Sequence, residues 1–364
     1  MTGACLARAG FNRKAAYATL AMTLAAEAPD LDTLWSAGGP IAAFQHHRGI
    51  THTFLGLPFE AAIVLGAVYL FHRWRLHRAK LSTDNPQPAT RNFTKAPIRW
   101  PLLYAFTLIA LLSHILLDWT NNYGIRPFFP FNPRWYADSI VFIFEPVLFA
   151  VLLMALTAPA LFGLISSEVG ARKATFRGRG WAIFALLSMV ALWGWRQVEH
   201  DDAIRLASTT TYGPADAPMP ELLRSTASPS PGNPYLWHTV VETPTFYQLA
   251  TINTLSNTVD TNPEQDILYK PPTTLATLVA KRSWLGEVYL DWSSWPVVTD
   301  TGPPTHVPGG SKPDGLTAVT FVDLRFMYDT SILEGRHNPP LSATVYINAD
   351  RHVAEMDMGG RLQK

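Results

Sequence analysis

Histidines and carboxylates recur beside the long apolar stretches of this 364-residue chain. His114 and Asp118 are four residues apart, so in a helix they share one face. Other members of the set come in short polar motifs, Ala-Pro-Asp-Leu-Asp and His-His-Arg-Gly-Ile-Thr-His. The complete set of candidate site residues is Asp30, Asp32, His47, Arg48, His52, His114, Asp118 and Glu145.

These side chains suit metal chemistry. Neutral imidazole and carboxylate oxygen are ligands for zinc, manganese or iron. A carboxylate that does not bind the ion can orient a histidine or act as a general base. Arg48 could clamp an anionic oxygen, because a guanidinium matches the geometry of phosphate. Metal-activated water beside an arginine is a plausible apparatus for hydrolysing a phosphoester.

A structural alternative exists for each of these residues. A single His or Asp at the end of an apolar stretch is usually an interfacial residue. Glu145 is different, because a carboxylate inside a membrane span is costly and by default functional, although it could simply pair with an arginine. The polar groups are predicted to share one side of a membrane, and this favours one shared metal or polar site.

The elements that position these residues are predicted from hydropathy. Four stretches approach the ~20 apolar residues that cross a bilayer. They are Phe54–Phe71, Trp100–Trp119, Ile140–Ile165 and Trp181–Val198. A fifth, Ala15–Ala28, is short and is expected to be half-spanning or re-entrant. In this prediction Asp138 opens the third span and Glu145 lies two turns inside it.

The basic residues set the predicted orientation, because cytoplasmic loops are enriched in Lys and Arg. The loop between the first two spans and the loop between the last two are basic, whereas the loop between the second and third holds only Arg126 and Arg134. The basic residues of the first loop are Arg73, Arg75, Arg78, Lys80, Arg91, Lys95 and Arg99, and those of the second are Arg172, Lys173, Arg177 and Arg179. The candidate site and everything after Val198 are therefore predicted on the outer face.

Composition divides the chain into a membrane part, residues 1–200, a linker, residues 201–234, and an extramembrane α+β domain, residues 235–364. The linker is rich in Pro, Ser and Thr. Strands are predicted at Trp237–Val241, Phe246–Ile252, Ala318–Tyr328 and Ser342–Ile347, with a helix at Thr273–Ala280. The fold class is thus an all-α membrane part of four to five helical segments joined to a C-terminal α+β domain.

Other global features narrow the function. The formal net charge of +1 gives no indication of a nucleic-acid partner. Cys5 is the single cysteine, so an internal disulfide and a cysteine zinc cluster are both excluded. The first residues do not have the pattern of a cleavable signal peptide.

An ordered series of motifs resembles the YdjM-like family of membrane-bound, predicted metal-dependent hydrolases. The likeness covers about residues 1–165. The series is Ala-Pro-Asp-Leu-Asp, His-Arg-Gly-Ile-Thr-His, His-Ile-Leu-Leu-Asp-Trp-Thr-Asn-Asn-Tyr-Gly and Arg-Pro-Phe-Phe-Pro-Phe. The stretches Asn-Pro-Tyr-Leu-Trp-His and Glu-Thr-Pro-Thr-Phe-Tyr look like the outer domain of longer members. The membrane part is distantly similar to the zinc-dependent phospholipase C and P1 nuclease group, which implies a phosphoester or lipid-like substrate.

The resemblance also implies roles for particular residues. A divalent metal, with zinc favoured, would be held by Asp32, His47, His52, His114 and Asp118. Asp30, Arg48 and Glu145 would form the rest of the catalytic apparatus. Family members typically carry an acid at the Asp138 and Glu145 positions, but the second is more often Asp. They also open with Asp-x-x-Thr-His-x-x-Thr-Gly, whereas this chain begins Met-Thr-Gly. Either the chain starts further upstream or this copy has lost a ligand.

Three functions follow from these patterns. The first is a multi-pass hydrolase of the bacterial inner membrane, acting at the outer face on a membrane lipid or lipid-linked substrate, with the C-terminal domain outside the cytoplasm. The alternative is a non-enzymatic scaffold, in which the polar cluster is structural and the C-terminal domain binds a partner. A transporter is the weakest, because the polar groups gather at one end of the spans and no inverted repeat is visible. The sequence leaves the oligomeric state and the number of ions open.

Overall fold

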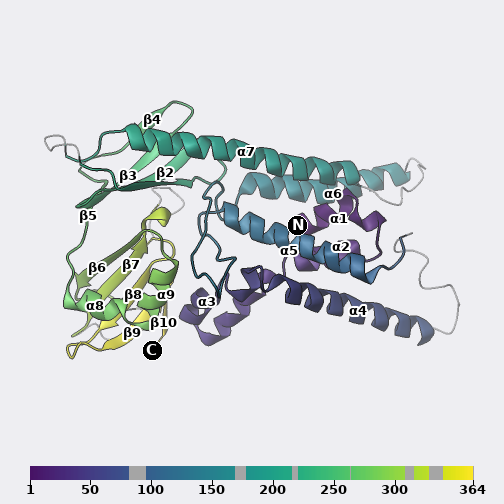
Figure 1. The fold of residues 1–364 in the computed structure, drawn as a ribbon, viewed down its shortest axis with the longest axis horizontal. Coiled ribbons are helices and arrows are strands. Elements are labelled where there is room, and N and C mark those ends of the chain that lie inside the picture. Colours follow the sequence, from purple (N-terminus) through teal and green to yellow (C-terminus); the bar gives the residue numbers. More distant parts are fainter. Residues whose placement is uncertain are drawn as a thin grey trace. The chain divides into compact units, whose positions relative to one another are not determined.

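A computed structural model describes residues 1–81, 96–168, 178–214, 220–262, 264–307, 315–327 and 339–363 (Figure 1). The chain forms two compact units. A helical unit comprises Met1–Asp32 and Arg48–Trp195, and a sheet unit comprises Thr33–His47 and Arg196–Lys364. The five basic loop residues Arg91, Lys95, Arg172, Lys173 and Arg177 lie outside the described residues.

Four long helices match the four predicted apolar stretches (Figure 1). They are α4 (Leu57–Leu81), α5 (Trp100–Thr120), α6 (Pro146–Glu168) and α7 (Arg179–Thr209). By length and composition, α5 and α7 can cross a membrane, and a third span results if the helical segments on either side of the break between His52 and Leu57 are counted as one. The apolar part of α6, Pro146–Phe162, is shorter.

The third predicted stretch starts later than expected. Helix α6 begins at Pro146, whereas the prediction began at Ile140. Proline suits the first helical position, and it disfavours helical geometry in the residue before it. Residues before Glu145 instead run extended beside the end of α5, where the Ile140 amide donates to the Thr120 carbonyl (2.9 Å). The expectation that Glu145 lies two turns inside a span is therefore wrong, since it immediately precedes the helix.

Two short helices complete the core of the helical unit. These are α1 (Thr2–Ala9) and α2 (Ala18–Ala25), joined by the 3₁₀ turn η1 (Phe11–Arg13). Helix α2 lies within the predicted short stretch Ala15–Ala28. A Cβ atom on Gly3 would lie 2.0 Å from the Met22 carbonyl oxygen, so only glycine lets α1 and α2 approach this closely. Small residues serve the same purpose in membrane helix packing, and the buried core here includes Ala7, Ala21, Ala25, Ala61 and Ala110.

The connection from α2 to α4 carries two polar motifs on short 3₁₀ turns. Turn η2 (Pro29–Gly38) contains Asp30 and Asp32, and turn η3 (Ile50–His52) ends at His52. Between them lies α3 (Pro40–His46), which belongs to the sheet unit. There Phe44 packs edge-on against Trp292, with ring centroids 5.1 Å apart.

The sheet unit contains two antiparallel sheets of five strands among its described residues. The first has the order β1-β2-β3-β4, with β5 also paired to β3, and the second has the order β10-β9-β8-β7-β6. The strands are β1 (Arg224–Pro229), β2 (Leu236–Glu242), β3 (Phe246–Asn253), β4 (Thr258–Asp260), β5 (Ile267–Tyr269), β6 (Pro296–Gly302), β7 (Thr317–Asp323), β8 (Ala343–Ile347), β9 (Val353–Met358) and β10 (Arg361–Gln363).

The predicted strands fall on β2, β3, β7 and β8, with one correction. Strand β7 ends at Asp323, whose side chain accepts from the Arg325 amide and begins the 3₁₀ turn η5 (Leu324–Phe326). The expected strand end at Tyr328 lies outside the described residues. The predicted helix is α8 (Leu275–Lys281), capped by Thr274, and α9 (Trp284–Trp292) follows it.

The segment predicted as a linker contains regular structure. Helix α7 continues to Thr209, and residues Arg224–Pro229 form β1, an edge strand of the first sheet. Proline is tolerated at an edge, where its missing amide breaks no ladder. The last turns of α7 pack Ala203 and Ala207 against the buried Trp237, so this helix belongs partly to the core of the sheet unit.

Candidate metal centre

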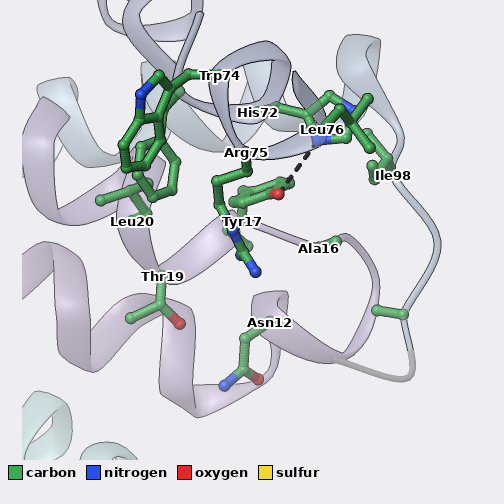
Figure 2. A pocket seen from close by; sticks show the side chains of 13 residues that line it. Asn12, Ala16, Tyr17, Thr19, Leu20, His72, Trp74, Arg75, Leu76 and Ile98 are labelled. Carbon is green, nitrogen blue, oxygen red and sulfur yellow. Dashed lines mark hydrogen bonds between the residues drawn. The ribbon is translucent and has the colours of Figure 1, made fainter. Parts of the chain in front are cut away.

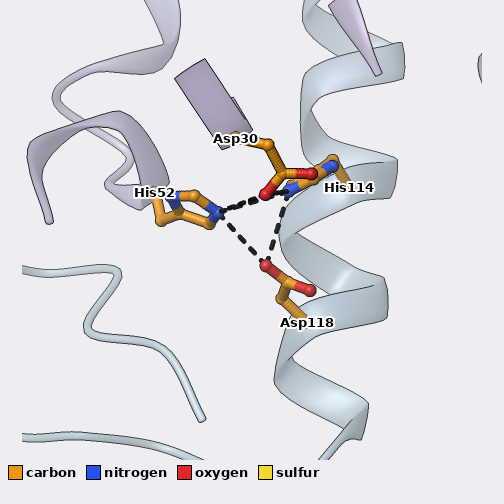
Figure 3. Close-up of side chains that lie close together, drawn as sticks. All are labelled: Asp30, His52, His114 and Asp118. Carbon is orange, nitrogen blue, oxygen red and sulfur yellow. Dashed lines mark hydrogen bonds and ion pairs between the residues drawn. The ribbon is translucent and has the colours of Figure 1, made fainter. Parts of the chain in front are cut away.

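Four ligand-type atoms from three segments of the helical unit converge on one point (Figure 3). Asp30 comes from η2, His52 from η3, and His114 and Asp118 from one face of α5. One nitrogen or oxygen of each lies within 4.8 Å of the corresponding atom of every other. A metal site of protein side chains needs several His, Cys, Asp or Glu residues close together, and among the described residues these four meet that condition.

Four of the distances between these atoms are close to the edge length of a coordination tetrahedron. Bonds of 2.0–2.1 Å to a tetrahedral zinc ion place neighbouring ligand atoms about 3.3 Å apart. The Nε2 atom of His52 lies 3.2 Å from Asp118 Oδ2 and 3.2 Å from His114 Nε2. His114 Nε2 lies 3.4 Å from the same Asp118 oxygen and 3.6 Å from Asp30 Oδ1. His52 Nε2 and Asp30 Oδ1 are 3.9 Å apart, the longest of these edges.

The far side of each imidazole is held by a different partner. His114 Nδ1 lies 2.8 Å from the Ala26 carbonyl oxygen, which can only accept, so Nδ1 carries the proton and Nε2 presents a lone pair. His52 Nδ1 lies 3.5 Å from Asp32 Oδ2 and 3.0 Å from Thr51 Oγ1. Metal-binding histidines are usually held in this way, with one nitrogen on the ion and the other on a carbonyl or carboxylate.

The Asp118 carboxylate is divided between two environments. Its Oδ1 accepts from Arg48 Nη2 at 3.0 Å. Its Oδ2 is buried and has no hydrogen-bond partner of acceptable geometry, although two imidazole nitrogens lie close to it. A buried carboxylate oxygen without a hydrogen bond is expensive. The arrangement fits a cation in the space that Asp30, His52, His114 and Asp118 share.

Arg48 is held by the protein on several sides. Besides Asp118, its Nη1 donates to the Gly124 carbonyl oxygen (2.8 Å) and to Asn121 Oδ1 (3.0 Å). The guanidinium lies 4.8 Å from the centre of the Tyr123 ring. Its backbone φ of 53° is unusual for a residue other than glycine. Sequence suggested Arg48 as a clamp for an anion, whereas the structure directs its donors to Asp118 and to the turn after α5.

Asp30 and Asp32 have exchanged positions relative to the sequence prediction. Asp30, proposed as a catalytic group, lies among the four converging residues. Asp32, proposed as a ligand, lies behind His52, where its Oδ2 also accepts from the Arg48 backbone amide at 2.6 Å. In a 3₁₀ helix each residue turns the chain by about 120°. Residues two apart therefore point in different directions, which the spacing Asp-Leu-Asp alone does not resolve.

Asn121 is a site residue for which sequence analysis gave no role. Its Oδ1 accepts from Arg48 and from the Tyr123 amide (2.9 Å), and it is only 4% exposed. It therefore ties the turn after α5 to the arginine that holds Asp118. The signal in the sequence is the polar run Thr-Asn-Asn directly after an apolar helix, where interfacial residues are expected anyway.

The two remaining predicted residues, His47 and Glu145, are not members of the group of four. His47 ends α3 in the sheet unit. Glu145 lines a cavity of about 330 Å³ together with Asp30, His114 and Asp118. The lining of that cavity also includes the apolar side chains Phe144, Leu148, Phe149 and Leu152. Glu145 thus faces the same space as the centre, from the start of α6.

Exposure differs among the four converging side chains. His52 is fully buried, and His114 and Asp118 are 11% and 14% exposed, whereas Asp30 is 50% exposed. Burial opposes ionisation of Asp30, but the neighbouring His114 and His52 imidazoles together outweigh this and lower the pKa of the carboxyl. Asp30 is therefore anionic at neutral pH and lies where the centre opens to the cavity.

Comparison with known proteins places the helical half of the chain in a family. Residues 1–203 match the model of the YdjM inner membrane protein family. The uncharacterized protein YfhP of Bacillus subtilis (strain 168) is 28% identical over 135 residues, which are 37% of this chain and 34% of YfhP. The chain thus spans about a third of the length of that relative, and no solved structure matches. Because the family match covers more than half of the sequence, this chain belongs to the YdjM family of inner membrane proteins.

Proposed function

We propose that the helical unit is a membrane-bound metal-dependent hydrolase, and that Asp30, His52, His114 and Asp118 hold its divalent ion. The observation that carries this proposal is the buried Asp118 Oδ2, which lacks a hydrogen bond yet lies 3.2–3.4 Å from two imidazole nitrogens. Zinc is the favoured ion, because two imidazoles and two carboxylates at these spacings suit a tetrahedral cation.

The protein's own groups have separable tasks in this proposal. His52 and His114 are buried, Asp118 is only 14% exposed, and each is held by a neighbouring group, so these three form the fixed part of the centre. Asp30 is half exposed at the cavity, so it is the member best placed to give way to a water molecule and to accept its proton. When bound, the ion would polarise an ester oxygen and lower the pKa of water.

Arg48 and Asp32 act in this scheme as positioning residues. Arg48 fixes one oxygen of Asp118 so that the other faces the centre. Asp32 connects the Arg48 backbone to the outer nitrogen of His52. Glu145, on the cavity wall, is available as a second acid or base at the leaving group.

The cavity favours a substrate with a polar head and an apolar tail. Its lining combines His114 and the Asp groups with the apolar side chains Phe144, Leu148, Phe149 and Leu152. A phosphoester of a membrane lipid or a lipid-linked phosphate has this character. We place the centre at the outer face of the inner membrane, with four to five helical membrane segments and the sheet unit outside the cytoplasm, because the predicted loop charges favour that orientation.

Metal content tests the proposal most directly. Full-length protein purified in detergent should contain near-stoichiometric zinc or a similar ion by elemental analysis. His114→Ala and Asp118→Asn should lose it, whereas His72→Ala, at the other end of the helices, should keep it. The same samples should be assayed on a short-chain phosphatidylcholine and on a soluble phosphodiester. Wild-type protein without bound metal, or variants with undiminished turnover, would overturn the proposal.

The scaffold alternative predicts a different pattern in those samples. If the cluster were purely structural, His114→Ala would lower the thermal midpoint while no sample hydrolysed either ester. A measurable turnover in wild-type protein that disappears in Asp118→Asn at unchanged helix content would exclude it.

A further inference from the structure

A second cavity lies at the other end of α5 from the metal centre (Figure 2). Its volume is about 550 Å³, and it is lined by the turn between α1 and α2, by α4, and by the residues that precede α5. Ile98 lies directly before α5, whereas His114 and Asp118 lie near its end. At 1.5 Å per residue the two sites are separated by about 25 Å along the helix.

The lining of this cavity is mostly apolar with a polar strip. The apolar part of the lining consists of Phe71, Trp74 and Leu76 of α4 together with Leu20, Ile98 and small residues. The polar strip consists of Asn12, Tyr17, Thr19, His72 and Arg75. Figure 2 shows Arg75 reaching from α4 toward the segment that carries Asn12 and Tyr17 and that leads into α2 with Thr19. The guanidinium carbon lies 6.0 Å from the centre of the Phe71 ring.

The wall that carries the polar strip is fixed in an unusual conformation. Tyr17 has a φ of 66°, which is rare for a bulky side chain and is usually retained only where surrounding contacts hold it. Its hydroxyl lies 3.1 Å from His72 Nδ1, and the neighbouring Ala16 amide donates to the Pro97 carbonyl (3.0 Å). Asn12 Oδ1 is buried without a hydrogen bond. The strip is therefore a built feature that presents polar groups to the cavity.

The described segments around this cavity carry charge of one sign. Residues 1–26, 61–81 and 96–117 contain no Asp or Glu. The basic residues close in sequence to the lining are Arg13, Lys14, Arg73, Arg75, Arg78 and Arg99. An arginine reaching into a largely apolar space, with further cations around it and no acid in these segments, suits an anion that carries hydrocarbon.

We propose that this cavity binds an anionic phospholipid of the membrane leaflet opposite the metal centre. The phosphate would lie against Arg75 and the strip of Asn12 and Thr19, and the acyl chains would lie against Phe71, Trp74 and Ile98. A lipid is favoured over a free anion because the apolar wall is itself exposed, with Phe71 at 40% and Trp74 at 50%, and the neighbouring Leu70 is 68% exposed. Juxtamembrane basic residues are known to attract anionic lipids in this way.

Lipid-dependent stability of full-length protein in detergent tests the assignment. In the Asp118→Asn background, where a lipid cannot bind through the metal centre, phosphatidylglycerol should raise the thermal midpoint at concentrations where phosphatidylcholine does not. Arg75→Gln should weaken the apparent affinity for phosphatidylglycerol about fivefold, and Arg75→Lys should retain part of it. The matched control is Arg78→Gln, because Arg78 lies over the Trp74 ring (4.7 Å) and does not line the cavity. It should change the affinity less than twofold.

Each other outcome overturns the assignment. Equal losses in Arg75→Gln and Arg78→Gln would mean diffuse attraction to the surface and no pocket. An equal midpoint shift from inorganic phosphate would mean a site for a free anion. No preference for phosphatidylglycerol would mean that another occupant fills the space. Because His114→Ala leaves this cavity intact, it should keep the lipid response, so failure of the hydrolase proposal and failure of this one can be told apart.

Discussion

Two aspartates that bind an arginine, one in each unit, show how differently this chain uses the same side chain. Asp323 in the sheet unit accepts from Arg325 through the backbone amide (3.0 Å), Nε (2.9 Å) and Nη2 (2.8 Å), and from Ser293 Oγ (2.6 Å). Both of its oxygens are saturated. Asp118 in the helical unit has one oxygen on Arg48, while the other has no hydrogen bond and faces two histidines and Asp30.

The difference separates a structural ion pair from a binding centre. A carboxylate whose oxygens already accept hydrogen bonds from the protein stabilises a turn and has no free acceptor position for a ligand. A carboxylate whose free oxygen meets three other ligand-type atoms has groups left to share with a cation. Stability should therefore depend mainly on Asp323, and metal binding mainly on Asp118. The predictions below test this division, beginning with the largest effect.

Asp323→Asn should destabilise the sheet unit by about 3–5 kcal/mol, because it leaves the Arg325 guanidinium buried without its counter-ion. Chemical unfolding of full-length protein, followed by the fluorescence of its tryptophans, measures the change. Asp350→Asn is the control, since Asp350 is exposed. Metal content should be unaffected. A loss below 1 kcal/mol would remove the basis for treating Asp323 as the structural member of the comparison.

Added zinc should stabilise metal-stripped wild-type protein by about 2.7 kcal/mol at 100 times its dissociation constant. Asp118→Asn should lose this response, because the converging oxygen is replaced, while Asp323→Asn should retain it. The shift of the thermal midpoint with zinc concentration gives both quantities. A full response in Asp118→Asn would contradict the assignment of the centre.

Much of the helical unit was predictable because apolar length is a strong signal. The four long helices lie where hydropathy indicated, and His114 and Asp118 share a face because α5 is a regular helix. The start of α6 was missed, since the apolar residues before Pro146 pair with the end of α5 as extended chain. Hydropathy does not distinguish these two uses of an apolar segment.

The site was predictable in its residues more than in their arrangement. The group of four contains three predicted ligands, His52, His114 and Asp118, together with Asp30, which was expected to be a catalytic group. Which aspartate of Asp-Leu-Asp faces the centre depends on how η2 is oriented, a tertiary property. Arg48 was suggested as an anion clamp because a guanidinium matches phosphate. Its partners Asn121 and the Gly124 carbonyl lie more than seventy positions away in sequence, so no local pattern indicated them.

The sheet unit was harder to predict, because pairing partners decide which short segments become strands. Segment β1 is rich in Ser, Thr and Pro, and it becomes a strand only because β2 pairs with it. In sequence, the α3 segment lies between two parts of the helical unit, but it contributes Phe44 to the aromatic packing around Trp292 in the sheet unit. Such a contact between distant parts of the sequence leaves no local pattern.

Arg48→Lys should weaken metal binding about tenfold, because residues behind metal ligands typically account for 10–100-fold in affinity. Lysine keeps the charge but cannot hold Asp118, Asn121 and the Gly124 carbonyl with one planar group. Competition with a zinc chelator measures the affinity. Arg126→Lys is the matched control, as Arg126 is also buried but stacks on the Phe129 ring (4.6 Å). Equal losses in both variants would mean general destabilisation and no positioning role.

The smallest effect concerns Glu242, another acidic residue of the sheet unit, whose ion pairs are more exposed than that of Asp323. Burial opposes its ionisation, but hydrogen bonds from Lys270 and Arg224 outweigh this and lower its pKa below the ordinary 4.5. The stabilisation of the folded state by Glu242 is therefore complete above pH 4.5. It is lost as the pH falls through the lowered pKa of Glu242 in the folded state. Lys270 and Arg224 are 30% and 46% exposed, so solvent screening limits that contribution to about 1 kcal/mol or less.

Glu242→Gln should accordingly flatten part of the acid dependence of unfolding, and 0.5 M salt should reduce the difference between wild type and variant. The Asp323 contribution has the same sign, since Arg325 and the hydrogen bonds lower the pKa of that carboxyl against burial. It should resist salt, because both partners are buried and ions cannot screen them. Unfolding midpoints between pH 3 and 7 at two salt concentrations measure both. Equal salt sensitivity would show that burial does not protect the Asp323–Arg325 pair from screening by ions. The distinction between a buried and an exposed ion pair would then have no physical basis in this protein.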